Sequence, residues 1–134
     1  MFQDKIVVHY QDGRVMKGYT NDFAPSKAFL HLLPMDASPG SQPFPISIPD
    51  LKAVFFVKDF WGNPQYQDKK DFEPQKPVSG RKIKVIFKDG ELLVGTTQGS
   101  QLDRPGFFVF PSDPISNNDR CYVVALATKG VWLI

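Results

Sequence analysis

Residues 5–10, KIVVHY, and residues 82–87, KIKVIF, begin two copies of one segment that lie 77 positions apart. An Asp-Gly pair follows each hexapeptide at the same distance, as Asp12-Gly13 and as Asp89-Gly90. At this offset 11 of the 53 pairs that start from residues 5–57 are identical, whereas chance gives about three. The chain is therefore an internal duplication, and each copy must specify the same local structure.

Each copy has the pattern of five short strands. In residues 5–10 apolar residues alternate along the chain, which is the period of a strand with one buried face. Asp-Gly between apolar runs predicts a hairpin with a type I′ turn, which needs positive φ at both central residues. Gly18 and Gly95 fall within the second strands, where glycine indicates a sharp bend or a close approach of two backbones. The expected strands are residues 5–10, 15–20, 28–33, 44–48 and 53–57 in the first copy, and 82–87, 92–97, 107–110, 121–126 and 131–134 in the second.

No stretch has a helical period, so the sequence predicts an all-β chain with three parts. The first copy covers residues 1–57, a linker covers 58–81 and the second copy covers 82–134. The C-terminal half of the linker is rich in proline and charge, and we expect it to be extended and solvated. Its N-terminal half carries the rings of Phe60, Trp61 and Tyr66, which we expect to pack on one of the copies.

The charge is balanced in every part of the chain. Residues 1–57 hold five basic and five acidic groups, 58–81 hold five and four, and 82–134 hold six and five, for a net charge of +2. This balance disfavours proteins that bind nucleic acid mainly through phosphates. The longest apolar runs reach about half a dozen residues, far below the roughly 20 of a membrane span. Asp4 and Lys5 stand where a signal peptide needs an apolar segment, so we expect a cytoplasmic protein without a membrane partner.

Chemically reactive side chains are few. Cys121 is the single cysteine and lies in an apolar run, so we expect a buried structural thiol. His9 and His31 have apolar counterparts in the second copy, and no carboxylate or third ligand stands at a recognisable spacing from them. The chain has no glycine-rich phosphate loop and no nucleophile elbow. We therefore expect a protein that is not an enzyme and holds no metal and no cofactor.

The order of strand, Asp-Gly turn, strand with a central glycine, loop and strand resembles the Sm-like family of small β-barrels. The resemblance is carried by Asp12-Gly13-Arg14, Gly18 and residues 29–33 in the first copy, and by Asp89-Gly90-Glu91, Gly95 and residues 107–110 in the second. SH3-like barrels share this hairpin arrangement, and the paired block also looks like uncharacterised bacterial proteins. The resemblance implies two tandem, small, five-stranded Sm/SH3-like barrels.

Sm-like proteins hold RNA with an Asp- or Asn-bearing loop after strand two and with a basic residue and glycine before strand five. Lys129-Gly130 matches the second element, whereas the first copy has Lys52-Ala53. The loop positions hold Asn21-Asp22-Phe23 and Gln98-Gly99, which depart from the family pattern. The resemblance thus implies RNA as a second candidate ligand. A cyclic-dinucleotide receptor of the PilZ type is a third alternative, although the chain lacks the Arg-x-x-x-Arg segment of that family.

Alternation along the fifth strands places Phe55 and Trp132 on the face opposite to their apolar neighbours. These two rings need another group to cover them, through packing between the copies, through packing under the Phe60-Trp61 segment, or at a partner surface. We expect a protein-interaction or regulatory scaffold with a protein partner, and a homodimer stays open. The alternative is a weak binder of single-stranded RNA or nucleotides that uses lysines beside an aromatic ring. The candidate contacts are Lys52, Lys129, Lys82, Lys84, Phe55, Trp132, Phe60 and Trp61.

Overall fold

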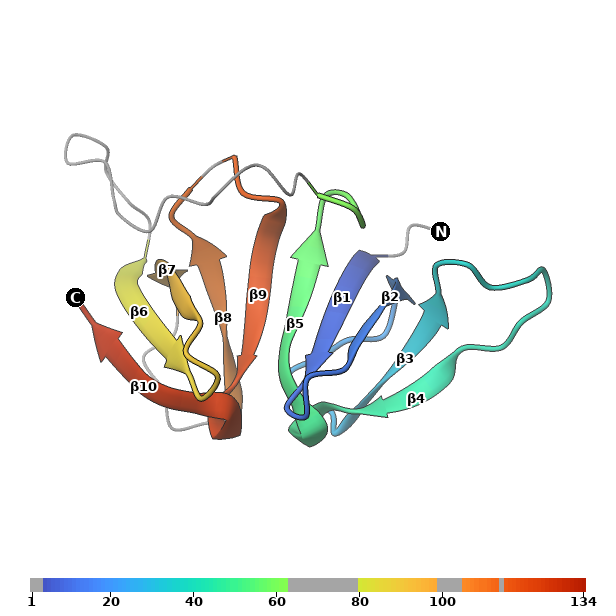
Figure 1. The fold of residues 1–134 in the computed structure, drawn as a ribbon, viewed down its shortest axis with the longest axis horizontal. Coiled ribbons are helices and arrows are strands. Elements are labelled where there is room, and N and C mark those ends of the chain that lie inside the picture. Colours follow the sequence, from blue (N-terminus) through green and yellow to red (C-terminus); the bar gives the residue numbers. More distant parts are fainter. Residues whose placement is uncertain (1–3, 63–79, 99–104, 114) are drawn as a thin grey trace.

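A computed structural model describes residues 4–62, 80–98, 105–113 and 115–134. Within these ranges the chain is all-β, as the sequence predicts, with two single-turn 3-10 helices as its only helical turns (Figure 1). No helix among the described residues has the length and apolarity needed to cross a membrane. Most of the expected linker, with Tyr66, its prolines and its charged run, lies outside the described residues. The strands are β1 (Asp4–Tyr10), β2 (Val15–Thr20), β3 (Phe29–Pro34), β4 (Phe44–Ser47), β5 (Leu51–Val57), β6 (Arg81–Phe87), β7 (Leu92–Thr97), β8 (Gly106–Pro111), β9 (Asn118–Val124) and β10 (Thr128–Leu133), and the 3-10 helices are η1 (Ile48–Asp50) and η2 (Ala125–Ala127).

The elements of the second copy repeat those of the first at the spacing found in the sequence. β1 and β6 begin at Asp4 and Arg81, β3 and β8 begin at Phe29 and Gly106, and each pair is 77 residues apart. η1 and η2 follow the same spacing, because they begin at residues 48 and 125. The internal duplication is therefore a duplication of secondary structure, including the short helices that the sequence pattern did not predict.

The Asp-Gly hairpins differ from the predicted type I′ turn. The backbone N of Tyr10 donates to the carbonyl of Arg14 at 2.8 Å, and that of Gly13 donates to the carbonyl of Tyr10 at 3.1 Å. The loop therefore has three residues, and Gly13 takes the left-handed conformation at a φ of 98° while no described non-glycine residue has positive φ. The Asp12 carboxylate accepts a hydrogen bond from the backbone N of Arg14 at 3.0 Å, which favours this loop. The prediction of two left-handed residues was wrong.

The central glycines of β2 and β7 mark close backbone approaches, as predicted. A Cβ on Gly18 would lie 2.3 Å from the carbonyl oxygen of Leu33, and one on Gly95 would lie 2.0 Å from that of Phe110. At both places the glycine lies opposite a proline of the neighbouring strand, where Gly18 pairs with Pro34 and Gly95 pairs with Pro111. Glycine is required there because no side chain fits between the strands.

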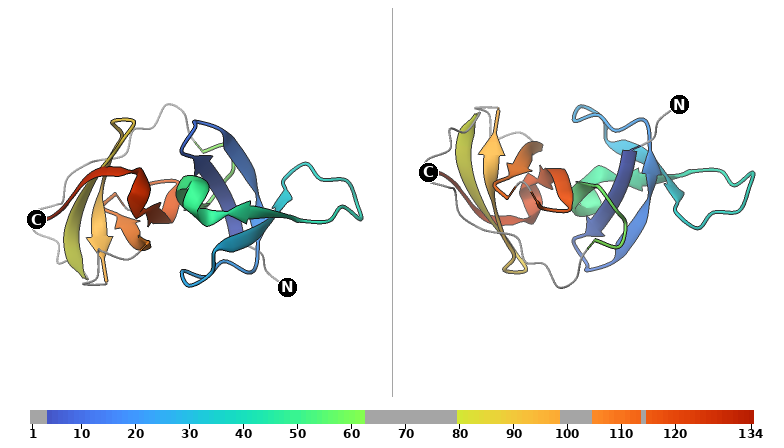
Figure 2. Two further views of the ribbon diagram at one scale, coloured as in Figure 1. Left: turned by 90° about the horizontal axis from the view of Figure 1, so that it is seen from below. Right: turned by 90° about the horizontal axis from the view of Figure 1, so that it is seen from above.

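All ten strands form one open antiparallel sheet, in the order β10-β6-β7-β8-β9-β5-β1-β2-β3-β4. Within each copy the fifth strand comes first and the others follow in sequence order, and each half of the sheet curls round its own interior (Figures 1 and 2). The sheet is continuous and open, with β10 and β4 at its edges, and it does not show the two separate barrels that the resemblance implies. The copies join where β5 of the first pairs with β9 of the second, from Ala53 opposite Val123 to Val57 opposite Asn118. We call this pairing the seam.

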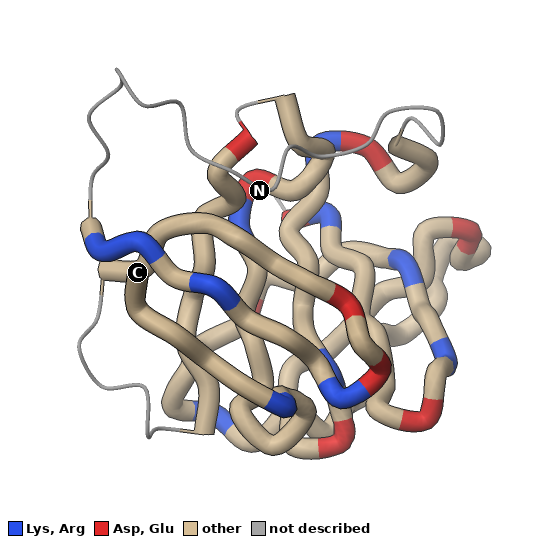
Figure 3. The backbone as a smooth tube through the Cα atoms, turned by 60° about the vertical axis from the view of Figure 1, so that its left-hand side comes forward, with Lys and Arg blue, Asp and Glu red and all other residues tan. Residues whose placement is uncertain are grey.

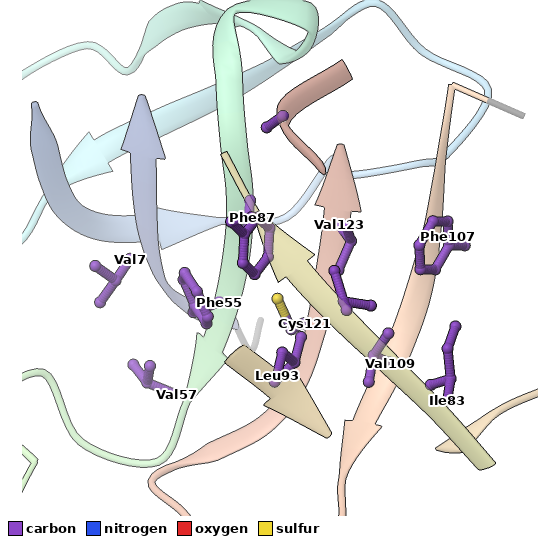
Figure 4. Close-up of a cluster of buried hydrophobic side chains, with 13 residues drawn as sticks. Val7, Phe55, Val57, Ile83, Phe87, Leu93, Phe107, Val109, Cys121 and Val123 are labelled. Carbon is purple, nitrogen blue, oxygen red and sulfur yellow. The ribbon is translucent and has the colours of Figure 1, made fainter. Parts of the chain in front are cut away.

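Every residue of β5 is buried, because the seam places β5 between the two copies and a core lies on each of its faces. Val54 and Phe56 face the core of the first copy, which also contains Tyr122 and Val124 from β9. Phe55 faces the core of the second copy, which contains 13 buried residues from both copies (Figure 4). The first copy gives that core Val7, Ala53, Phe55 and Val57. Each core is therefore completed by side chains from the other copy.

This sharing predicts that one copy cannot fold alone. A fragment of residues 1–62 would expose the side chains that the second copy covers, and each large apolar side chain left exposed costs about 1.5–3 kcal/mol. The sum is comparable with the whole stability of a small domain, about 5–15 kcal/mol. We expect the fragment to show no cooperative thermal transition by circular dichroism. A fragment that melts cooperatively would show instead that the two copies are independent.

Candidate functional site

Lys52, next to the start of the seam, is a buried charged residue with an exposure of 7%. Its ammonium donates to Asp89 Oδ2 at 2.7 Å and to a carboxylate oxygen of Glu91, and it lies 4.7 Å from the ring centre of Phe87. Both carboxylates belong to the hairpin turn of the second copy. The first copy is therefore held to the second by a buried cation as well as by strand pairing.

The local folding of β5 and of the β6 to β7 turn produces this arrangement. Lys52 lies at an irregularity of the β1 and β5 ladder, where His9 pairs with Ala53 and Tyr10 with Leu51. The extra residue turns the Lys52 side chain out of the ladder and toward the second copy. Burial alone lowers the pKa of Lys52, but the hydrogen bonds that Lys52 donates to Asp89 and Glu91 outweigh this effect and the net pKa is raised. Lys52 is therefore an ion-paired cation between the two copies.

His9 lies at the same junction. Its ring meets Phe55 edge to face, with the ring centres 4.8 Å apart. Burial and the nearby charge of Lys52 lower its pKa, and Glu91 and Asp89 oppose that effect only in part. His9 is thus held as a neutral, half-buried ring against the seam.

Asp22 and His31 form a pair that the sequence pattern did not predict. The Asp22 carboxylate lies 2.7 Å from His31 Nδ1 and also accepts from the backbone N of His31 at 3.0 Å. Burial raises the pKa of Asp22, but the hydrogen bonds from His31 and Thr20 lower it by a larger amount, so the net pKa is lowered. Asp22 therefore supplies His31 with a carboxylate partner that no recognisable spacing in the sequence indicated. Among the described residues no group of three or more His, Cys, Asp or Glu side chains could hold a metal.

Cys121 is fully buried, as predicted, and burial raises the pKa of its thiol well above the ordinary value. It lies in the core of the second copy, directly opposite Phe55 in the seam. A protonated thiol without solvent access is a packing group.

The aromatic segment after β5 packs only in part. Phe60 meets Tyr19 edge to face at 5.2 Å and packs against the core of the second copy. Lys17 donates to the carbonyl of Phe60 at 2.9 Å and lies 5.0 Å from the ring centre of Trp61. Trp61 itself is 71% exposed. The expectation that these rings pack on a copy is confirmed for Phe60. Trp61 stays exposed, and its ring lies beside the ammonium of Lys17.

β10 is the counterpart of β5, but it lies at an edge of the sheet with β6 as its single neighbour. Phe55 is 6% exposed in the seam, whereas its counterpart Trp132 is 48% exposed. Leu133 and Ile134 beside it are also exposed. The Trp132 ring lies over Gly130, whose missing side chain leaves the space. We call Val131, Trp132, Leu133 and Ile134 the β10 edge.

The remaining predicted lysines lie near the β10 edge. Lys84 on β6 is the direct cross-strand partner of Trp132, and the carbonyl of Lys82 accepts a hydrogen bond from the backbone N of Ile134 at 3.0 Å. Lys82 and Lys129 are exposed and Lys84 is half-buried. Basic and acidic positions are interspersed along the backbone on the side that Figure 3 presents. The structure thus places Lys82, Lys84, Lys129 and Trp132 on β6 and β10, whereas Lys52 and Phe55 lie on β5 and Phe60 and Trp61 follow it.

Sequence reasoning missed the two acidic partners of Lys52. The signal lay in a charge reversal between the copies, because Glu91 stands where the first copy has Arg14. The buried lysine belongs to one copy and the acidic turn to the other. Only the sheet order, in which the second copy lies against β5, brings them together.

Removing the two carboxylates tests the seam ion pairs. We expect Asp89→Asn combined with Glu91→Gln to destabilise the chain by about 1–2 kcal/mol, since Lys52 stays buried while its partners are about half exposed. Urea unfolding with an unchanged slope measures this loss. The matched control is Asp12→Asn with Arg14→Gln in the exposed turn of the first copy, which should cost less than about 0.5 kcal/mol. Equal losses in the two turns would contradict a special role for Lys52.

His9 predicts a pH dependence of stability. Its folded pKa lies below the unfolded value of 6.5, so the unfolded chain takes up a proton first as the pH falls. Stability should therefore decrease as the pH falls below 6.5, until the folded pKa is reached. His9→Ile, which installs the residue of the second copy, should remove this part of the slope in urea midpoints measured at successive pH values. An unchanged slope in the variant would show that His9 is not the responsible group.

Comparison with known proteins gives a family but no activity. No curated protein and no solved structure matches the chain at significant similarity. The family of unknown function DUF6982 matches residues 2–134, which is nearly the whole chain. The match spans both copies, and the chain therefore belongs to DUF6982.

Proposed function

We propose that the protein is a non-enzymatic interaction module that binds a protein partner through the β10 edge. The observation that carries the proposal is the contrast between two equivalent strands. Residues 54–57 and 131–134 are both apolar on both faces. In β5 the seam buries both faces, whereas in β10 a tryptophan, a leucine and an isoleucine stay exposed at an unpaired sheet edge. Exposed apolar side chains beside free backbone groups favour docking of another protein.

The alternative of single-stranded RNA or nucleotide binding has weaker support. Lys84 beside Trp132 supplies a cation next to a ring, as such a site requires. Lys52, however, is committed to Asp89 and Glu91, so the two copies cannot present a matched pair of lysines. Titration of mixed RNA oligomers separates the two functions: binding that falls steeply with salt favours RNA, and no binding at low salt removes it. Nothing in the geometry favours a PilZ-like cyclic-dinucleotide site.

We also propose that each copy is a relative of the Sm/SH3-like units, opened and joined through the seam. The strand order within each half, with the fifth strand next to the first and the others in succession, supports this relation. The close glycine contacts in β2 and β7 support it as well. A cytoplasmic protein interaction agrees with this proposal and with the balanced charge of both copies.

A single exposed substitution tests the interaction surface. We expect Trp132→Glu to abolish retention of at least one protein that the wild-type chain captures from an extract of its host, because a carboxylate would replace the exposed ring. Trp61→Glu is the matched control, since Trp61 is the other exposed tryptophan and lies beside Lys17, away from β10 in the sequence and in the sheet. Captured proteins are compared by mass spectrometry. Identical sets from the wild type and both variants would exclude the β10 edge as the docking surface.

A further inference from the structure

The seam joins two different surfaces, the fifth strand of one copy and the fourth strand of the other. In a head-to-tail contact of this kind each copy uses only one of the two surfaces, so each copy keeps the other surface unpaired. The unused fifth strand is β10 and the unused fourth strand is β4, and these are the two edges of the sheet (Figure 1). β10 is therefore the counterpart of a strand that already has an antiparallel neighbour in the same molecule.

We propose that β10 accepts an antiparallel edge strand from a different protein, in the register that β5 uses for β9. The inference rests on the proposed function and names the partner: a proline-free edge strand with acidic side chains within reach of Lys129. A second copy of this chain is the obvious competitor, and its β4 is unsuited to the role.

The backbone of β10 presents the same groups that β5 uses in the seam. The N of Ile134 donates to Lys82 on β6, and backbone groups alternate sides along a strand, so those of Val131 and Leu133 face away from the sheet. Their counterparts are Val54 and Phe56. The backbone groups of Val54 and Phe56 face β9, where the two residues lie opposite Tyr122 and Arg120. An incoming strand thus finds the donors and acceptors that the seam already uses.

A second copy cannot supply the matching strand, because proline stands where the seam needs a donor. In β4 the N of Ile48, just after the strand, donates to the carbonyl of Ala28, so alternation turns the backbone of Pro45 outward. Pro45 is exposed and is the counterpart of Tyr122. Proline has no N–H, so pairing of β4 with β10 would leave an acceptor of β10 unpaired at this position.

Two further features of the seam are missing from a second copy. The counterpart of Lys52 is Lys129, and the residues that would meet it are Asp12 and Arg14 in place of Asp89 and Glu91. Asp12 already binds the Arg14 guanidinium at 2.8 Å, so the turn offers Lys129 a cation. At the end of the seam the Asn117 side chain clamps Asp59, because it donates to the carbonyl of Asp59 at 2.8 Å and accepts from the backbone N of Asp59 at 3.1 Å. The counterpart of Asn117 is Gly40, which has no side chain.

The chain itself provides the probe for this surface. A labelled peptide of residues 117–125 with Cys121→Ser carries the strand that β5 accepts. We expect saturable binding to the intact chain by fluorescence anisotropy, with slower amide exchange at Val131 and Leu133. The same peptide with Tyr122→Pro, which copies Pro45, should bind at least about tenfold more weakly, and Trp132→Glu in the chain should weaken binding similarly.

Three results would overturn the inference: no binding of the peptide, equal binding of the proline peptide, or protection that changes only in the seam strands. If the peptide fails while partner capture still depends on Trp132, strand addition is wrong and the proposed interaction function stands. If partner capture is also insensitive to the substitution of Trp132, both strand addition and the proposed interaction function of the β10 edge are wrong.

Self-association provides the second test. The wild-type chain should sediment as a monomer at micromolar concentration, since β4 is blocked. Pro45→Tyr combined with Arg14→Glu restores the counterparts of Tyr122 and Glu91 and should produce larger assemblies, which the further change Trp132→Glu should dissolve. Wild-type assembly through β10, or a restored variant that stays monomeric, would contradict the assignment of β4 as the blocked edge.

Discussion

The pairing of β5 with β9 is the interaction on which the rest of the structure depends. Ten strands that the sequence divides into two equal sets become one sheet only at this seam. The side chains of β5 and β9 point alternately into the two cores, so Phe56 and Tyr122 enter one core while Phe55 and Cys121 enter the other. Phe23, Phe56, Phe108 and Tyr122 form an aromatic cluster with members from both copies. Neither half therefore has a complete apolar interior without the other.

The two copies have diverged in the residues that decide what meets their edges. In the seam a buried lysine meets two carboxylates, and an asparagine side chain closes the end. At the outer edges the corresponding positions hold an exposed lysine, an aspartate already paired with arginine, and a glycine. Proline occupies the outward position of β4. Among the described strands, these differences leave β10 as an exposed apolar edge without the features that surround the seam.

Much of the local structure follows from the sequence. Residues 15–20 and 92–97 form strands with the predicted bounds, and the central glycines lie at the predicted close contacts. The fifth strands begin two or three residues earlier than predicted, because an irregularity in each ladder at Lys52 and Lys129 hides the start of the alternation. The arrangement of the copies could not be predicted, because the buried strand β5 and the exposed strand β10 have the same apolar sequence pattern. The Asp22 and His31 pair was missed because a loop brings together residues nine positions apart.

The most direct test of a shared core is native-state amide hydrogen exchange across both copies. If the seam makes the two copies one cooperative unit, the amides of Val8 in the first copy, Val85 in the second, and Val54 and Tyr122 in the seam should exchange through the same global opening. Their opening free energies should agree with each other and with the free energy of unfolding from urea titration. Opening of either copy at a clearly lower free energy, with the other copy still protected, would contradict the account.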